Sequence, residues 1–412
     1  MERVVITGMG IVSPLGNELD TFWNKLKAGE SGISSIDSFD ASEYKTQIAG
    51  LVKNLDAEER WGRKEARKMD RFTQFGLYAA EQALEHSGLD LDKLDRERLG
   101  VYVGSGIGGI ETLVHNVDLL RDRGKGRVSP TMVPMMISNM AAAQISIRLG
   151  SMGPSLSPVT ACSIGNTAIG EAFRLIRTGE ADVIFAGGTE AAVHPLALAG
   201  FGNATALSVR NHAPQQASRP FDAGRDGFIM SEGAGILVLE SLAHAKNRGA
   251  TIYGEVIGYG ASSDAYHMVA PHPEGTGAYI AMKTALKTAG IQPDHIDVIS
   301  AHATSTEAGD LAETKAIHRL LGDHAYSVPV TANKSMLGHM LGASGGAEAI
   351  ALVQTLREGV VPPTINLDHP GEGCDLDYVP NQARLGHFQI GLSNSFGFGG
   401  HNAVIVLKRF DE

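Results

Sequence analysis

Cysteine is scarce in this 412-residue sequence, which contains only Cys162 and Cys374. The two lie far apart and form no CxxC pair, so the sequence offers neither a disulfide framework nor a cysteine-based zinc site. We therefore expect no bound metal. A reducing cytoplasm is the compartment that fits best.

An excess of positive charge is also absent. The 35 Lys and Arg residues are outnumbered by 46 Asp and Glu residues, which gives a net charge of −11. A chain of this charge does not coat nucleic acid or an anionic membrane through its overall field. We expect no nucleic-acid partner, and any anionic partner must find a local basic patch.

Long hydrophobic runs are missing as well. No apolar run reaches the roughly 18 residues of a membrane span, and the most apolar stretch, residues 128–150, is broken by Asn139, Gln144 and Arg148. The start, MERVVITGMG, lacks the charged region, apolar stretch and cleavage site of a signal peptide. We expect a soluble cytoplasmic protein with no membrane attachment.

Glycine, in contrast, is abundant, with 50 residues against a usual share of roughly 7%. Short β-branched runs alternate with helix-length amphipathic segments, which is typical of an α/β protein. The strand candidates are residues 3–10, 99–106, 181–188, 235–240, 296–301 and 402–410, and the helix candidates include 72–87, 275–289 and 310–321.

The two halves of the chain are faintly similar. RVVITGMGIVSP resembles IYGEVIGYGASSD, and VTACSIGNTAIGEA resembles VTANKSMLGHMLGASGGAEA. The identities are few, but they indicate two similar α/β halves, 1–251 and 252–412, with the site at their junction.

A glycine motif, Gly104-Ser-Gly106-Ile-Gly108-Gly109, follows a strand candidate and matches the GxGxxG pattern of dinucleotide binding. The full fingerprint also needs a second strand that ends in an acidic residue about 20 positions on. The chain instead continues RDRGKGRVSPTMVPMM. We favour glycines required for close backbone packing beside an acyl or peptide-like ligand.

Cys162 lies between an extended stretch and a helix that ends at Gly179. Free N–H groups at a helix N-terminus stabilise a thiolate and lower its pKa, and they can also hold an oxyanion. A small buried hydrophobe is the alternative reading. Cys374, in GEGCDLDY, has acidic neighbours that would raise its pKa, and we expect it to be structural.

Two histidines stand at comparable turns. His302 follows a strand in VISAHATST, and His339 opens a helix in SMLGHMLGASGG. Each alone is more often a hydrogen-bonded structural residue. One cysteine and two histidines at three such turns favour a nucleophile with partners that donate or accept protons.

Four motifs occur in order along the chain: TACSIG around Cys162, HATST around His302, NKSMLGH around His339, and NSFGFGGHN near the end. With them the whole chain resembles the β-ketoacyl-acyl carrier protein synthases, specifically the elongating type II enzymes. The resemblance implies a thiolase-like five-layer α/β/α/β/α fold built from two duplicated halves.

The resemblance also implies the reaction, a decarboxylating Claisen condensation. Cys162 takes an acyl group from the phosphopantetheine arm of acyl carrier protein, so the enzyme itself needs no cofactor. His302 and His339 then donate to the malonyl thioester oxygen, where enolate charge develops.

Further roles follow from the same resemblance. Lys334 supports the histidines and pairs with Glu348, while Thr304 and Thr306 bind the pantetheine arm. The Phe398 ring gates the acyl site, and its N–H forms the oxyanion hole with that of Cys162. Ile107 forms a wall of the acyl pocket.

Acyl carrier protein is acidic in this family, so it needs a basic surface on this acidic chain. Arg63, Lys64, Arg67, Lys68 and Arg71 are candidates, because positions 64, 67, 68 and 71 share one face of a helix. Lys125 and Arg127 form a second basic loop. A solvated helix face is the alternative. As in the family, we expect a homodimer.

Two departures from the family pattern concern pocket shape: Ala303 stands where Gly is usual, and Ser163-Ile164 replaces Ala-Thr or Ser-Ser. His401 stands where Thr is frequent, and we assign it no role. Four other functions stay open: an aromatic polyketide ketosynthase, a thiolase or starter synthase that uses coenzyme A, a non-catalytic chain-length partner, and a cysteine hydrolase. Cys162 argues against the chain-length partner, and the second histidine argues against the hydrolase.

Overall fold

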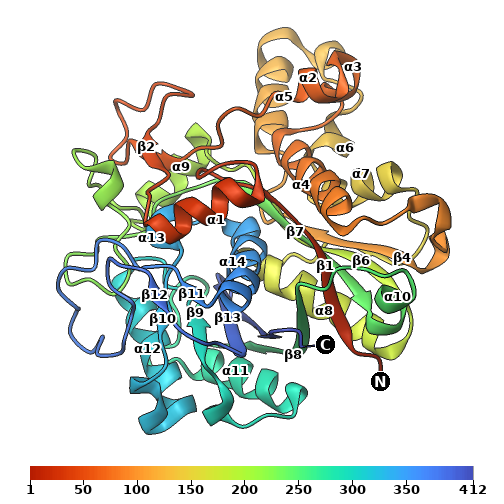
Figure 1. Ribbon diagram of the computed structural model, residues 1–412. Coiled ribbons are helices and arrows are strands. Elements are labelled where there is room, and N and C mark those ends of the chain that lie inside the picture. The colour runs from red at the N-terminus through yellow and green to blue at the C-terminus, as the bar shows by residue number, and fades with distance from the viewer. Residues whose placement is uncertain (412) are drawn as a thin grey trace.

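Ten strands form the main sheet in the computed structural model, which describes residues 1–411 (Figure 1). Their order is β10-β9-β13-β14-β8-β1-β7-β6-β4-β5. One side of the sheet is built from β1 (Val4–Val12), β4 (Leu99–Gly104), β5 (Ser155–Leu156), β6 (Val183–Glu190) and β7 (Gly233–Ser241). The other is built from β8 (Gly254–Ser263), β9 (Val298–Ser300), β10 (Val330–Thr331), β13 (Ile390–Gly397) and β14 (His401–Lys408).

The two groups of five strands have the same topology. Counted along the chain within each group, the strands lie in the order 3-2-4-5-1. In both groups the second strand pairs in parallel with the third and fourth, and the fifth pairs antiparallel with the fourth and first. The boundary that we predicted at residues 251 and 252 lies between α10 (Leu242–Asn247) and β8, and it stays a prediction.

A short ladder joins the two groups. β1 and β8 pair only through Val4, Val5 and Ile6, opposite Val256, Glu255 and Gly254. Two helices, α8 (Ile164–Thr178) and α14 (Ser344–Glu358), pack between the two groups of strands and contact both of them. Figure 1 shows both helices at the centre of the molecule.

Helices also cover the outer faces. α4 (Arg71–Ser87) and α7 (Met140–Leu149) pack on the first group, while α11 (Thr276–Ala289) packs on the second and against α12 (Glu307–Leu321). The layers are therefore α/β/α/β/α, and the predicted thiolase-like fold is confirmed.

Burial of the two central helices explains their composition. α14 is buried continuously from Ser344 to Leu356, so no polar face is required. Its first turn crosses α8 closely: a Cβ built on Gly165 would lie 2.4 Å from the backbone nitrogen of Gly346. Glycine on both helices permits this approach.

The remaining elements are short or lie at the periphery. They are α1 (Leu19–Ala28), β2 (Ile33–Ser35), β3 (Ile48–Gly50), α2 (Ala57–Trp61), α3 (Arg63–Ala66), α5 (Ile110–Arg123), α6 (Met132–Met136), α9 (Pro195–Asn203), α13 (Lys334–Leu337), β11 (Val360–Val361) and β12 (Arg384–Leu385). α2, α3, α5 and α6 form a projection at the top of Figure 1.

The sequence did not predict β13. Its centre carries Ser393, Asn394 and Ser395, all fully buried, so a hydrophobic pattern is missing. Across residues 1–411, no helix is both long enough and apolar enough to span a membrane.

Candidate active site

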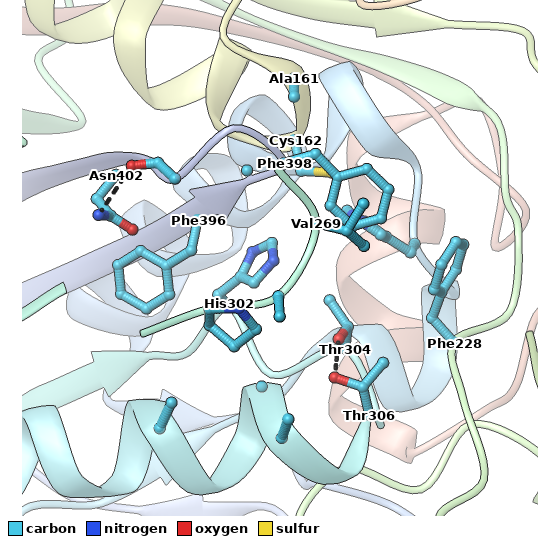
Figure 2. A pocket seen from close by; sticks show the side chains of 18 of the residues that line it. Ala161, Cys162, Phe228, Val269, His302, Thr304, Thr306, Phe396, Phe398 and Asn402 are labelled. Carbon is cyan, nitrogen blue, oxygen red and sulfur yellow. Dashed lines mark hydrogen bonds between the residues drawn. The ribbon is translucent and has the colours of Figure 1, made fainter. Parts of the chain in front are cut away.

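A cavity of about 360 Å³ opens between the two halves and contains most of the predicted site. Figure 2 looks into it, with Cys162 close to Phe398 and with His302 near the centre of the view. The predicted residues that line the cavity are Ile107, Cys162, His302, Thr304, Thr306, His339 and Phe398.

Cys162 lies on the 3-10 turn Ala161–Ser163, immediately before α8. Ala161 adopts a φ of 51°, which turns the backbone sharply at this point. Burial raises the pKa of the Cys162 thiol to about 11, although the Lys334 charge and the N–H groups of Phe398 and Cys162 lower it and the Glu190 charge adds to the increase. The N–H groups lower the pKa as we expected, but burial outweighs them and the net change is an increase.

The two predicted histidines meet beside this thiol. His302 follows β9 and His339 follows α13, and their ring centroids are 5.4 Å apart at an interplanar angle of 86°. Burial first, and then the positive charge of Lys334, lowers the pKa of each imidazole well below its usual value. Both rings are therefore neutral at physiological pH.

Hydrogen bonds orient one ring. Nδ1 of His339 lies 3.1 Å from the Ser344 hydroxyl at the start of α14. When Ser344 donates this bond, the ring proton is on Nε2. Among the described residues, Nδ1 of His302 has no hydrogen-bond partner.

Lys334 and Glu348 form a fully buried ion pair behind the histidines. Burial raises the pKa of Glu348 to about 7, while Lys334 opposes the increase. The pair comes from α13 and the interior of α14, so it connects the turn that carries His339 with the central layer.

A buried glutamate that the sequence analysis missed holds the His302 backbone. Glu313 on α12 accepts the N–H of His302 at 2.9 Å and that of Ala303 at 2.8 Å. Asn394 of β13 donates to the same carboxylate at 3.0 Å. No local pattern marks these two residues, because they reach His302 from separate elements.

A second missed glutamate, Glu190, lines the cavity at the end of β6. A signal for it existed, because ADVIFAGGTE places an acidic side chain at the end of an apolar strand. The glycine motif lies beside it, and close packing accounts for its glycines: a Cβ on Gly104 would lie 2.4 Å from the carbonyl oxygen of Pro158. The dinucleotide fingerprint is not needed to explain them.

Phe398 stands at the mouth of the cavity and is 37% exposed. Gly399 and Gly400 follow with φ of 84° and 74°, values that favour glycine. The centroid of the Phe398 ring is 6.2 Å from that of Phe201, at an interplanar angle of 49°.

Thr304 and Thr306 lie together along another part of the cavity wall. Their hydroxyl oxygens are 3.1 Å apart (Figure 2). Neighbouring hydroxyls of this kind suit the amides of an extended polar ligand.

The predicted single basic helix face is wrong. α3 covers only Arg63–Ala66, and Asp70 caps a separate helix, α4, by accepting the N–H of Phe72. The Arg71 side chain has partners of its own: it donates to Glu232 at 3.0 Å and lies over the Phe75 ring.

The other docking candidates are exposed, and none of them lines the cavity. Lys68 pairs with Glu65 at 2.7 Å, and Arg67 lies 3.7 Å from Glu58. Lys64 is on α3, and the 3-10 turn Lys125–Arg127 carries the other two cations, Lys125 and Arg127.

Cys374 is buried in the core of the second half. Burial raises the pKa of its thiol, Arg225 lowers it and Asp310 adds to the increase. The direction agrees with our expectation, but the principal cause is burial rather than acidic neighbours in the sequence.

Duplicated halves that bring a cysteine and two histidines into one cavity define the class of thiolase-like ketosynthases. Family comparison agrees: residues 1–245 match the family described as beta-ketoacyl synthase, N-terminal domain, and residues 253–368 match the corresponding C-terminal domain. The chain belongs to the β-ketoacyl synthase family.

Individual relatives cover the full length. The chain is 50% identical over 409 residues to a 3-oxoacyl-[acyl-carrier-protein] synthase 2 of Synechocystis, covering 99% of this chain and 98% of the relative. It is 48% identical to the protein of the same name from Staphylococcus aureus, covering 100% and 99%.

Solved structures are similar as well. A beta-ketoacyl synthase from Burkholderia phymatum superimposes with a TM-score of 0.93 at 35% identity, covering all of both chains. A type II polyketide ketosynthase, solved in complex with its acyl-carrier protein and bound to the hexaketide, gives a TM-score of 0.92 at 35% identity, covering 99% of this chain and 100% of that one.

Proposed function

We propose that this protein condenses acyl carrier protein thioesters with malonyl carrier protein, releasing carbon dioxide and giving 3-oxoacyl carrier protein in fatty acid elongation. The observation that carries the proposal is the meeting of Cys162 with two neutral histidines, His302 and His339, in one cavity. Full-length relatives named 3-oxoacyl-[acyl-carrier-protein] synthase 2, at about 50% identity, support it.

In the first step, Cys162 Sγ attacks the carbonyl carbon of the acyl thioester. The bond from that carbon to the pantetheine sulfur breaks, and the thiol proton leaves with the pantetheine thiol. The N–H groups of Phe398 and Cys162 both act on the cysteine sulfur. These N–H groups are therefore placed to stabilise the negative charge that develops on the carbonyl oxygen when the carbonyl carbon bonds to Sγ.

In the second step, malonyl carrier protein occupies the same cavity and loses carbon dioxide. The electron pair of the broken bond becomes an enolate, whose oxygen accepts hydrogen bonds from His302 and His339. A neutral imidazole carries one ring N–H, which can donate such a bond. The enolate carbon then attacks the carbonyl carbon of the Cys162 thioester, the bond from that carbon to Sγ breaks, and the released thiolate takes up one proton from solvent, which replaces the proton that left with the pantetheine thiol.

The buried Lys334 has two electrostatic effects in this scheme. Its charge favours neutral histidines, and it also lowers the cost of a transient thiolate at Cys162. Glu348 balances the buried charge. Thr304 and Thr306 are proposed to bind the pantetheine arm, and Ile107 to form the wall of the acyl pocket.

The partner is proposed to be an acidic acyl carrier protein that supplies the phosphopantetheine, so the enzyme needs no cofactor of its own. The exposed cations Lys64, Arg67, Lys68, Lys125 and Arg127 are the proposed docking surface. A solved ketosynthase of the same fold forms a complex with its acyl-carrier protein, which supports this partner.

A cytoplasmic location is proposed from the two free cysteines, which suit a reducing compartment. A homodimer is proposed from the edge of the sheet. β5 is the last strand in the order, and both of its residues, Ser155 and Leu156, are exposed. Met152 and Val159 beside it are 72% and 58% exposed. An unpaired edge with apolar neighbours suits a second copy of the chain, and sedimentation at micromolar concentration tests it.

Intact mass spectrometry tests the reaction. Wild type mixed with acyl carrier protein thioester is expected to gain the acyl mass, and malonyl carrier protein is expected to remove it as 3-oxoacyl product. His302→Ala should still gain the acyl mass but condense about 10²–10³ times more slowly, because one enolate donor is lost. His318→Ala, a surface variant at the Asp375 pair, is the matched control.

Two results would contradict the proposal. Release of free fatty acid as the sole product would indicate a hydrolase. No acyl mass on wild type would remove Cys162 as the nucleophile and favour a binding role.

A further inference from the structure

Glu190 is fully buried and accepts four hydrogen bonds. Its Oε1 accepts from the Ser105 hydroxyl at 2.8 Å and the Ile107 N–H at 3.1 Å. Its Oε2 accepts from the Gly106 N–H at 2.9 Å and the Gly342 N–H at 3.1 Å. The first three donors belong to one half of the molecule and the last to the other half.

The bonded groups require an ionised carboxylate. Three of the donors are backbone N–H groups, which cannot accept a hydrogen bond from a protonated carboxyl group. The fourth, Ser105, already accepts from the Gly108 N–H at 3.0 Å and is left to donate to Glu190. Burial raises the pKa of Glu190, while these four hydrogen bonds lower it. A carboxylic acid here would place its own hydrogen against donors, so the geometry favours the ionised form.

The two loops that Glu190 holds both border the reaction. One carries Ile107, which lines the cavity, and the other is the turn Leu341–Ala343, which begins two residues after His339. Little space remains between carboxylate and loops, since Cβ atoms on Gly106 and Gly342 would lie 3.0 and 2.9 Å from Oε2.

We propose that Glu190 is a positioning residue that fixes the Ile107 wall against the His339 turn and so sets the acyl-chain selectivity of the cavity. The inference rests on the proposed function, because it takes the cavity to be the acyl site. Glu190 also faces the thiol, and its negative charge disfavours the Cys162 thiolate.

Glu190→Gln tests the inference, because an amide can accept from only one of the two pairs of donors. The measurement is kcat/KM for hexanoyl and for myristoyl carrier protein. We expect the ratio of the two to change by at least about threefold, since the wall moves. In an Ile107→Ala background the same substitution should leave the ratio unchanged, because the wall side chain is already gone.

A second readout does not depend on the acyl substrate. Removing the negative charge stabilises the thiolate, so iodoacetamide should alkylate Cys162 about threefold faster at neutral pH. Glu240→Gln is the matched control: Glu240 is also fully buried and multiply bonded, to Arg248 and His244, but lies outside the cavity lining. It should lower stability without changing the ratio or the alkylation rate.

An unchanged ratio in Glu190→Gln, with both rates lowered equally, would overturn the inference. Where that variant is insoluble or takes up neither chain, Ser105→Ala, which loses one of the four bonds, must show a smaller change of ratio, and an unchanged ratio there overturns it as well. If wild type takes up neither chain, the proposed function fails instead.

Discussion

The starts of α8 and α14 occupy equivalent places in the two halves, and only one of them carries a reactive group. Each helix follows a 3-10 turn whose first residue has a positive φ, 51° at Ala161 and 48° at Leu341. The second residue is Cys162 in one turn and Gly342 in the other. One fold element thus supplies the thiol, whereas its counterpart supplies a backbone N–H that Glu190 accepts.

The comparison shows that the two similar halves supply different catalytic groups. The first half positions the nucleophile, and the second half places His302 and His339 around it. The crossing of α8 and α14 at Gly165 and Gly346 brings the two turns close enough to share one cavity.

The largest expected effect comes from removing the one reactive group in this comparison. Cys162→Ala should lower condensation by more than about 10³-fold, because no covalent acyl intermediate can form. Gly342→Ala, at the equivalent turn, should still be acylated, although its Cβ would crowd Glu190. Intact mass after mixing with acyl carrier protein measures both; acyl transfer at full rate by Cys162→Ala would overturn the assignment.

The pH dependence of alkylation tests whether burial or the helix start controls the thiol. With a pKa raised to about 11, the Cys162 thiolate fraction falls about tenfold for each pH unit below that value. The rate at which iodoacetamide alkylates Cys162 should therefore rise steadily from pH 7 to beyond pH 9. Alkylation of Cys374, measured in the same samples, is the internal control. A plateau below pH 8 would show that the helix N-terminus outweighs burial.

Stability should report the crossing of the two helices. Gly165→Ala places a Cβ 2.4 Å from the Gly346 backbone nitrogen, and overpacking of this kind costs about 1–3 kcal/mol. Gly200→Ala on α9 is the matched control: no described atom outside its own stretch of helix lies within 4 Å of its Cβ, so it should stabilise by about 0.5–1 kcal/mol. Chemical denaturation measures both, and equal effects would mean that the crossing is loose.

The smallest effect concerns the surface. Lys64→Glu in the first half should raise KM for acyl carrier protein about two- to fivefold at low salt, because rim charges mainly steer association. Lys287→Glu, exposed on α11 of the second half, should leave KM unchanged. Equal effects at both positions would place docking outside the first half.

Some features were readable from local patterns, and others were not. Strands such as β1 and β6 are buried throughout and appear in the sequence as largely apolar runs, and Gly179 ends α8 with a φ of 81° as a helix terminator. β13 was missed because its buried centre is polar. The single basic helix face was wrong because Asp70 starts a new helix after α3.

The sequence by itself determined the α/β alternation, the three turns that carry Cys162, His302 and His339, and the motifs that indicate the family. These depend on local propensity and spacing, which a linear chain displays directly. Only the tertiary structure decided that burial raises the pKa of Cys162 and lowers those of the histidines, and that Glu190 and Glu313 hold the surrounding loops. The reason is that desolvation and long-range hydrogen bonds arise only when segments distant in the chain pack together.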